Sequence, residues 1–224
     1  MNLDHIQLNM REQARFNMIE QQIRTWEVLD PTVLDLLHVV PREEFVPSQY
    51  VGLAFADLEI PLGNGESMLS PKMEARIVQS LSLKPTDTVL EIGTGIGYLT
   101  ALLAKLTKQV SSVERIAELA AAAIGNLRKH GINNVTVETG DGAQGWNAGT
   151  YDVIVLGGSV PELAPAFQQS LNIGGRLFAV IGEAPAMEAK LITRLGADHF
   201  QSIVLFETCI PVLENAPQRE HFTF

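Results

Sequence analysis

Three glycines and a nearby carboxylate in the middle of the chain have the types and spacing of a ligand site. Gly93, Gly95 and Gly97 follow the apolar run Val89–Ile92, which contains Glu91, and precede a helical pattern. Glycines let the backbone turn sharply and pass close to a ligand, and the following helix offers free N–H groups at its positive end. The pattern predicts a site for a nucleotide-type ligand, although a tight turn in an unrelated α/β protein would also fit it.

The spacing of the glycines favours one class of ligand. A dinucleotide site needs G-x-G-x-x-G below a pyrophosphate, whereas this chain has G-x-G-x-G. Glu91 would repel a pyrophosphate but suits the ammonium group of an amino-acid-bearing ligand. Glu114 closes the next apolar run and suits bidentate hydrogen bonding to ribose hydroxyls. These residues predict S-adenosylmethionine as the cofactor and argue against NAD.

Length and composition indicate the number of domains and exclude some classes of partner. The 224 residues, 46% of them hydrophobic, predict one globular domain. The formal net charge of -10 argues against nucleic acid as a partner, because phosphate contacts need clustered Lys and Arg. The N-terminal residues lack a signal pattern and no apolar run reaches a membrane-spanning length. We therefore expect a cytoplasmic protein with no membrane contact.

Cysteines and histidines give no pattern for a metal site. The five histidines show no ligand spacing, and the single cysteine excludes an internal disulfide framework. That residue, Cys209, lies in a strand-like run and is interpreted as a core thiol rather than a nucleophile. We expect no metal.

Two regions must position the glycine turn and its surroundings. Apolar residues at helical spacing predict helices within residues 10–38, the second starting at Asp30-Pro31, and over residues 72–81. Residues 41–71 are punctuated by prolines and glycines and are interpreted as a loop.

From Thr88 onward, short apolar runs alternate with helical stretches. This alternation is typical of parallel strands with covering helices. Residues 200–209 and 211–213 look instead like two strands without a helix between them. They predict an antiparallel pair at the edge of the sheet.

The chain resembles the protein-L-isoaspartate O-methyltransferase family almost end to end. The blocks that carry the resemblance are Met18–Arg24, Val40–Pro47, Leu90–Thr100, Val113–Arg115, Gly140–Gly142, Gly145-Trp146 and Tyr151–Val155. The resemblance implies an α/β fold of the class I, Rossmann-like methyltransferases: a doubly wound, seven-stranded, mostly parallel sheet with one reversed edge strand, plus N-terminal helices. It implies a single domain over 1–224, in which residues 1–80 cover the substrate and residues 81–224 form the cofactor-binding core.

The resemblance also implies a set of cofactor-binding residues. They are Glu91, Gly93, Thr94, Gly95, Gly97, Glu114, Arg115, Asp141 and Gly142. Asp141 could accept the amino hydrogens of the adenine, and Gly142 would let the base lie flat against the backbone. The alternative for Asp141 is an aspartate that forms a turn beside glycine.

The segment before the third predicted helix departs from the family. Where the family has Gly-Gln-Thr-Ile-Ser-Gln-Pro, this chain has Gly65-Glu66-Ser67-Met68-Leu69-Ser70-Pro71, so Leu69 occupies the position of the family's active-site serine. Ser67 and Ser70 are the candidate catalytic hydroxyls in this segment, and Ser159 is a third candidate near the end of the fourth predicted strand. Loop capping is the alternative role for each serine.

The resemblance implies methyl transfer to L-isoaspartyl carboxylates of damaged proteins, by a monomer or weak homodimer that binds protein or peptide substrates. Two alternatives stay open because the substrate segment differs. One is a methyltransferase of the same fold with a different acceptor, and the other is a catalytically weak module that binds S-adenosylmethionine.

Overall fold

A computed structural model describes residues 3–146 and 149–218 of the chain. The chain divides into two compact units, with the boundary between Gln79 and Ser80. The predicted internal division after residue 80 lies beside this boundary, and the single domain stays a prediction. Among the described residues, no helix has both the length and the apolar character needed to cross a bilayer.

The predicted N-terminal helices are confirmed. α1 spans Leu3–Met18, and the chain continues through a π turn and a 3-10 turn before α2, Pro31–Val39. The side chain of Asp30 accepts the Thr32 N–H at 2.8 Å. This bond satisfies one of the free donors at the start of α2, where a proline has no N–H to satisfy.

The region interpreted as a loop contains a β-hairpin. β1 (Ile60–Gly63) and β2 (Glu66–Met68) pair antiparallel, and α3 (Pro71–Leu81) follows them. The connection is Asn64-Gly65, whose φ angles of 55° and 84° both lie in the left-handed region that a tight hairpin turn requires. Strands of four and three residues are too short to show alternation, so the loop interpretation was wrong here, whereas the helix over residues 72–81 is confirmed.

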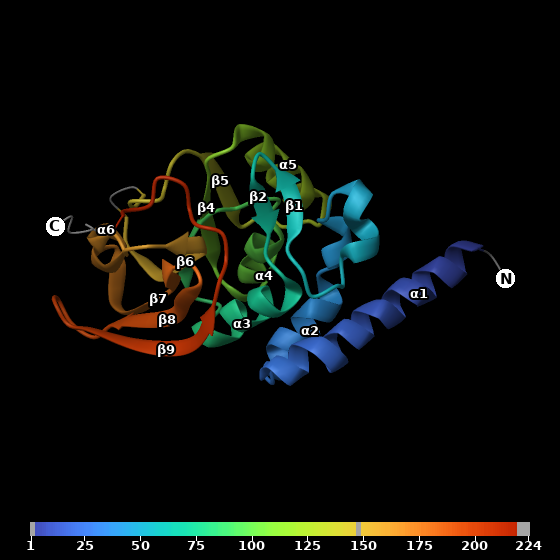
Figure 1. The fold of residues 1–224 in the computed structure, drawn as a ribbon, viewed down its shortest axis with the longest axis horizontal. Coiled ribbons are helices and arrows are strands. Elements are labelled where there is room, and N and C mark those ends of the chain that lie inside the picture. The colour runs from blue at the N-terminus through green and yellow to red at the C-terminus, as the bar shows by residue number, and fades with distance from the viewer. Residues whose placement is uncertain (1–2, 147–148, 219–224) are drawn as a thin grey trace. The chain divides into compact units, whose positions relative to one another are not determined.

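The second unit is built on one seven-stranded sheet in the order β5-β4-β3-β6-β7-β8-β9 (Figure 1). Its strands are β3 (Thr88–Ile92), β4 (Gln109–Glu114), β5 (Val135–Thr139), β6 (Tyr151–Val160), β7 (Leu171–Glu183), β8 (Ala186–Arg194) and β9 (Phe200–Thr208). The first five strands in this order are parallel, and β8 runs antiparallel to both of its neighbours. The predicted fold class and the single reversed strand are confirmed, with β8 second from the edge and β9 outermost.

Helices connect the parallel strands as predicted. They are α4 (Tyr98–Leu106), α5 (Ala117–Lys129) and the short α6 (Pro165–Gln169). Buried side chains from the central strands form the core of this unit, including Leu90, Ile154 and Leu177, which have no exposed surface. Burial on both faces explains why these strands are continuous apolar runs in the sequence.

The partner of β9 is not the predicted segment 211–213. β9 pairs with β8, and Val212 forms only an isolated parallel bridge with Ser159. β8 was missed although its apolar and charged residues alternate from Met187 to Leu191, the pattern of a strand with one buried face. The interpretation of Cys209 as a core thiol was also wrong, because this residue is exposed.

Candidate functional site

The glycine turn joins the end of β3 to the start of α4. Gly93, Gly95 and Gly97 have φ angles of 93°, 56° and 88°, a region that side chains disfavour. A Cβ added to Gly97 would lie 3.3 Å from the Cβ of Ala123 in α5. The backbone conformation therefore favours glycine at all three positions, and at Gly97 the close approach of α5 adds to this requirement.

Glu114, at the end of β4, holds the glycine turn by hydrogen bonds. Its Oε2 accepts the Gly95 N–H at 2.8 Å, and its Oε1 accepts the Ile116 N–H at 2.9 Å. The carboxylate is 6% exposed. Each carboxylate oxygen has a second lone pair, so Glu114 can hold the turn and still accept hydrogen bonds from a ligand.

Glu91 lies beneath the turn, with no exposed surface. Its Oε2 accepts hydrogen bonds from the hydroxyls of Thr100 and Ser112, each at 2.6 Å. Since the single Ser112 hydroxyl hydrogen goes to Glu91, the Thr94 hydroxyl, also 2.6 Å from Ser112 Oγ, must be the donor of that pair. The buried network thus connects the turn to both β4 and α4.

The pairing of Glu91 with an ammonium group stays a prediction, and the burial of Glu91 limits it to an interaction through charge. A side chain without exposed surface does not reach a ligand on top of the turn. Glu91 Oε1 is nevertheless a buried acceptor with no hydrogen-bond partner among the described residues. A cationic group bound at the turn would compensate the charge of this carboxylate, because Coulomb attraction is little screened in a buried site. The turn and its buried carboxylate therefore fit the predicted cofactor.

Burial raises the pKa of Glu91 to about 7, and this shift is only partly opposed by the hydrogen bonds from Ser112 and Thr100. The folded protein therefore binds a proton between the ordinary pKa of 4.5 and about 7, where the unfolded chain does not. We therefore expect the contribution of Glu91 to the free energy of unfolding to fall as pH rises through this window, by about 3 kcal/mol in total.

We expect Glu91→Gln to remove this pH dependence, because glutamine cannot ionise. Above pH 7 the variant should gain stability over the parent protein, and near pH 5 the two should be similar. Urea unfolding across this pH range measures the difference. Glu207→Gln, at an exposed position of β9, is the control that should leave the slope unchanged. Identical slopes for the parent and Glu91→Gln would contradict the prediction.

Asp141 and Gly142 lie in the turn that follows β5, and their contact with the adenine stays a prediction. Asp141 Oδ1 accepts the Ala143 N–H at 3.1 Å, and Oδ2 accepts from Asn215 Nδ2 at 2.7 Å. The first bond is that of a turn-forming aspartate, the alternative considered above. A Cβ on Gly142 would lie 2.8 Å from Ile92 Cδ1. Core packing thus favours glycine here, because the Ile92 side chain would have to move to admit a Cβ.

The segment 210–216 lies along the predicted cofactor residues, and the sequence analysis did not assign it to the site. Glu214 forms an ion pair with Arg115, and Asn215 binds Asp141 as described above. A Cβ on Gly93 would lie 3.5 Å from Leu213 Cδ2. No local signal marks these residues, because their partners lie about seventy or more positions earlier in the chain.

Ser159 is not available to an acceptor in this structure. Its side chain has no exposed surface, and its hydroxyl donates to the Ile210 carbonyl at 3.0 Å. The Ser159 N–H also donates to the Pro211 carbonyl at 2.8 Å. Ser159 therefore anchors the segment 210–216 to β6, which corrects its prediction as a candidate catalytic hydroxyl.

The candidate acceptor segment lies in the first unit. Ser67 is in β2, and its hydroxyl donates to Glu59 Oε2 at 3.3 Å. Burial raises the pKa of Glu59, and the hydrogen bond from Ser67 opposes this rise. Leu69 and Ser70 are 7% and 8% exposed, immediately before α3.

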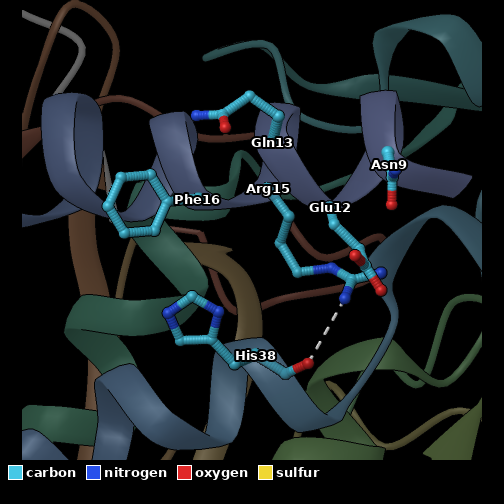
Figure 2. A pocket seen from close by; sticks show the side chains of 6 residues that line it. All are labelled: Asn9, Glu12, Gln13, Arg15, Phe16 and His38. Carbon is cyan, nitrogen blue, oxygen red and sulfur yellow. Dashed lines mark hydrogen bonds between the residues drawn. The ribbon is translucent and has the colours of Figure 1, made fainter. Parts of the chain in front are cut away.

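The first unit also contains a hollow that none of the predicted site residues lines. A pocket of about 570 Å³ lies beside α1 and α2 (Figure 2). Its lining residues are Asn9, Glu12, Gln13, Arg15, Phe16 and His38. The Arg15 side chain donates to the His38 carbonyl at 3.3 Å across it. Within the described part of the chain, no group of three His, Cys, Asp or Glu residues is arranged to hold a metal ion.

Comparisons with known proteins agree on one family. The family model for protein-L-isoaspartate(D-aspartate) O-methyltransferase matches residues 13–215. The chain is 38% identical to a protein-L-isoaspartate O-methyltransferase of Koribacter versatilis over 90% of this chain and 91% of that protein. It is 37% identical to the one of Serratia proteamaculans over 89% of this chain and 96% of that protein.

Solved structures share the fold. A structure of a protein-L-isoaspartate O-methyltransferase is 25% identical, with a TM-score of 0.76 over 90% of this chain and 65% of that one. A candidate enzyme of this type from Plasmodium falciparum, in complex with S-adenosyl-L-homocysteine, is 22% identical. Its TM-score is 0.75 over 88% of this chain and 97% of that chain. The likeness therefore extends over nearly the whole chain.

Proposed function

Because the chain belongs to the protein-L-isoaspartate(D-aspartate) O-methyltransferase family, we propose that it transfers a methyl group from S-adenosylmethionine to L-isoaspartyl carboxylates of damaged proteins. The family match over residues 13–215 carries this proposal. The turn Gly93–Gly97, held by Glu114, supports it independently, since its spacing disfavours a pyrophosphate.

The residues proposed to hold the cofactor surround this turn. Gly93, Thr94, Gly95 and Gly97 provide the backbone surface, and Glu114 accepts hydrogen bonds from the ribose hydroxyls while it holds Gly95. Arg115, Asp141 and Gly142 complete the set, and the Glu91 carboxylate acts from below through its charge. When bound, S-adenosylmethionine supplies an electrophilic methyl group.

The acceptor needs positioning more than acid–base catalysis. A carboxyl group with a pKa of about 4 is already ionised at neutral pH. Aligning the reacting atoms can supply roughly 7–11 kcal/mol of the barrier. We assign the orientation of the acceptor carboxylate to the hydroxyls of Ser67 and Ser70, with the Ser67 O–H turning from Glu59 to the acceptor when the substrate binds. The substrate is a protein or peptide, and the proposed active form is a monomer or weak homodimer in the cytoplasm, without nucleic acid or membrane.

A different acceptor is the second candidate. Leu69 favours it, because a buried leucine at the family's serine position cannot donate a hydrogen bond to a carboxylate. The same protein would then bind the cofactor normally and transfer its methyl group elsewhere.

One set of assays separates these functions. The purified protein is mixed with labelled S-adenosylmethionine and an isoaspartyl peptide, the matched aspartyl peptide or a cell extract, and calorimetry measures the binding of S-adenosylhomocysteine and NAD. We expect the protein to methylate the isoaspartyl peptide and not the matched aspartyl peptide. We also expect it to bind S-adenosylhomocysteine and not NAD. Cofactor binding with transfer only to components of the extract would identify a different acceptor. Cofactor binding without any transfer would identify a binding module.

A further inference from the structure

One buried arginine of the first unit joins three separate segments. The Arg42 side chain is 1% exposed, its Nε donates to the Ala54 carbonyl at 2.9 Å, and its Nη2 donates to the Leu69 carbonyl at 2.6 Å. Its Nη1 forms an ion pair with Glu74 in the first turn of α3, itself 2% exposed. The guanidinium thus connects the segment before the hairpin, the segment after it and the following helix.

An ion pair buried this completely is weak evidence for stability, because removing two charges from water costs about as much as their attraction returns. The fixed directions of its hydrogen bonds distinguish this ion pair from an apolar pair of the same volume. The guanidinium is planar and its donors have fixed directions, so binding two carbonyls and one carboxylate fixes the segments relative to one another. A pair of apolar residues could fill the same space but would not orient the Leu69 carbonyl.

Anchoring this carbonyl also orients the next residue. The peptide unit between Leu69 and Ser70 is planar, and its N–H points away from its carbonyl in the trans form. The Ser70 N–H is therefore directed away from Arg42. The Ser70 carbonyl accepts the N–H groups of Met73 at 3.0 Å and Glu74 at 3.2 Å. The backbone of Ser70 is consequently held from both sides.

We propose that Arg42, together with Glu74, is a positioning residue for methyl transfer: it holds Leu69–Ser70 in the conformation in which Ser70 presents its N–H and hydroxyl to the acceptor. The inference rests on the proposed function of this segment. It explains how an acceptor can be oriented although Leu69 has no hydroxyl. Arg42 itself contacts neither the acceptor nor the cofactor.

The test is a double substitution that removes the ion pair and keeps the volume. Arg42→Met/Glu74→Met should leave S-adenosylhomocysteine affinity within about twofold, because the proposed cofactor residues all lie beyond residue 80. With cofactor saturating, kcat/KM for the isoaspartyl peptide should fall about tenfold or more, the size expected for one lost orienting bond. Arg15→Met/Glu43→Met is the matched control, since this ion pair lies in the same unit, with side chains 15% and 7% exposed, and the hydrogen bonds of Arg15 go to Glu43 and to the His38 carbonyl.

Arg42→Lys is the second variant, for use if the double variant does not fold. We expect it to fold, because a lysine retains a positive charge beside Glu74. It cannot reproduce the fork that binds two carbonyls, so kcat/KM should again fall, by about fivefold or more, with cofactor affinity unchanged. Parent-like kcat and KM in a folded variant would overturn the proposal, and so would equal losses in the control pair.

Hydrogen exchange separates this inference from the proposed function. In the Arg42 variants the amide hydrogens of residues 65–70 should exchange about tenfold faster than in the parent protein. In the Arg15→Met/Glu43→Met control the same amide hydrogens should exchange at the parent rate. If the parent protein does not methylate isoaspartyl peptide, the proposed function fails. Faster exchange in residues 65–70 would then still support the positioning role of Arg42, and unchanged exchange would overturn it.

Discussion

Glu114→Gln should weaken S-adenosylhomocysteine binding by roughly tenfold to a hundredfold. The carboxylate accepts the N–H groups of Gly95 and Ile116 with separate oxygens. Glutamine replaces one oxygen with an NH₂ donor, which would face one of these N–H groups and could not accept from the ribose. Loss of one charge-assisted bond, about 1.5–3 kcal/mol, gives this range. Calorimetry measures the affinity directly.

Glu118→Gln is the control for this experiment, because Glu118 is an exposed carboxylate in the first turn of α5. It should leave the affinity unchanged to within about twofold. Thermal unfolding of both variants establishes that they are folded. Unchanged cofactor affinity in a folded Glu114→Gln protein would show that the carboxylate only shapes the turn.

Leu69→Ser should raise the methylation rate of isoaspartyl peptide by roughly tenfold to a hundredfold. It introduces a hydroxyl donor at the position of the family's serine, and one hydrogen bond to a charged acceptor is worth about 1.5–3 kcal/mol. Since Arg42 holds the Leu69 carbonyl, the backbone should keep its place. Steady-state kinetics with saturating cofactor measure the effect.

Leu69→Ala is the matched control, because it also removes the buried isobutyl group but adds no hydroxyl. Both variants should lose stability, by about 2–5 kcal/mol for the alanine, so rates are compared at temperatures where both are folded. Ser70→Ala should reduce the parent rate if Ser70 supplies the donor instead. Equal rates for the serine and alanine variants at position 69, together with undiminished turnover after Ser67→Ala and Ser70→Ala, would show that no hydroxyl in this segment is needed.

Much of the fold was accessible to sequence reasoning because its signals are local. An apolar period within a window of about ten residues specifies each of the elements β3, α4, β4 and α5. The glycine turn is the connection between β3 and α4. The hairpin β1–β2 also has a local signal, Asn64-Gly65, which outweighs its short strands. β8 has a weaker local signal, the alternation of apolar and charged residues over 187–191, and its pairing with β7 and β9 stabilises it.

By itself the sequence determined the family, the parallel sheet and the turn between Glu91 and Glu114. Only the tertiary structure decided what the polar atoms do. Glu91 binds Ser112 from the next strand, Ser159 binds the Ile210 carbonyl, and Asp141 binds Asn215. The physical reason is that a residue's type fixes how many hydrogen bonds it can make, whereas its partners come from segments that are distant in the chain and meet only when the protein folds.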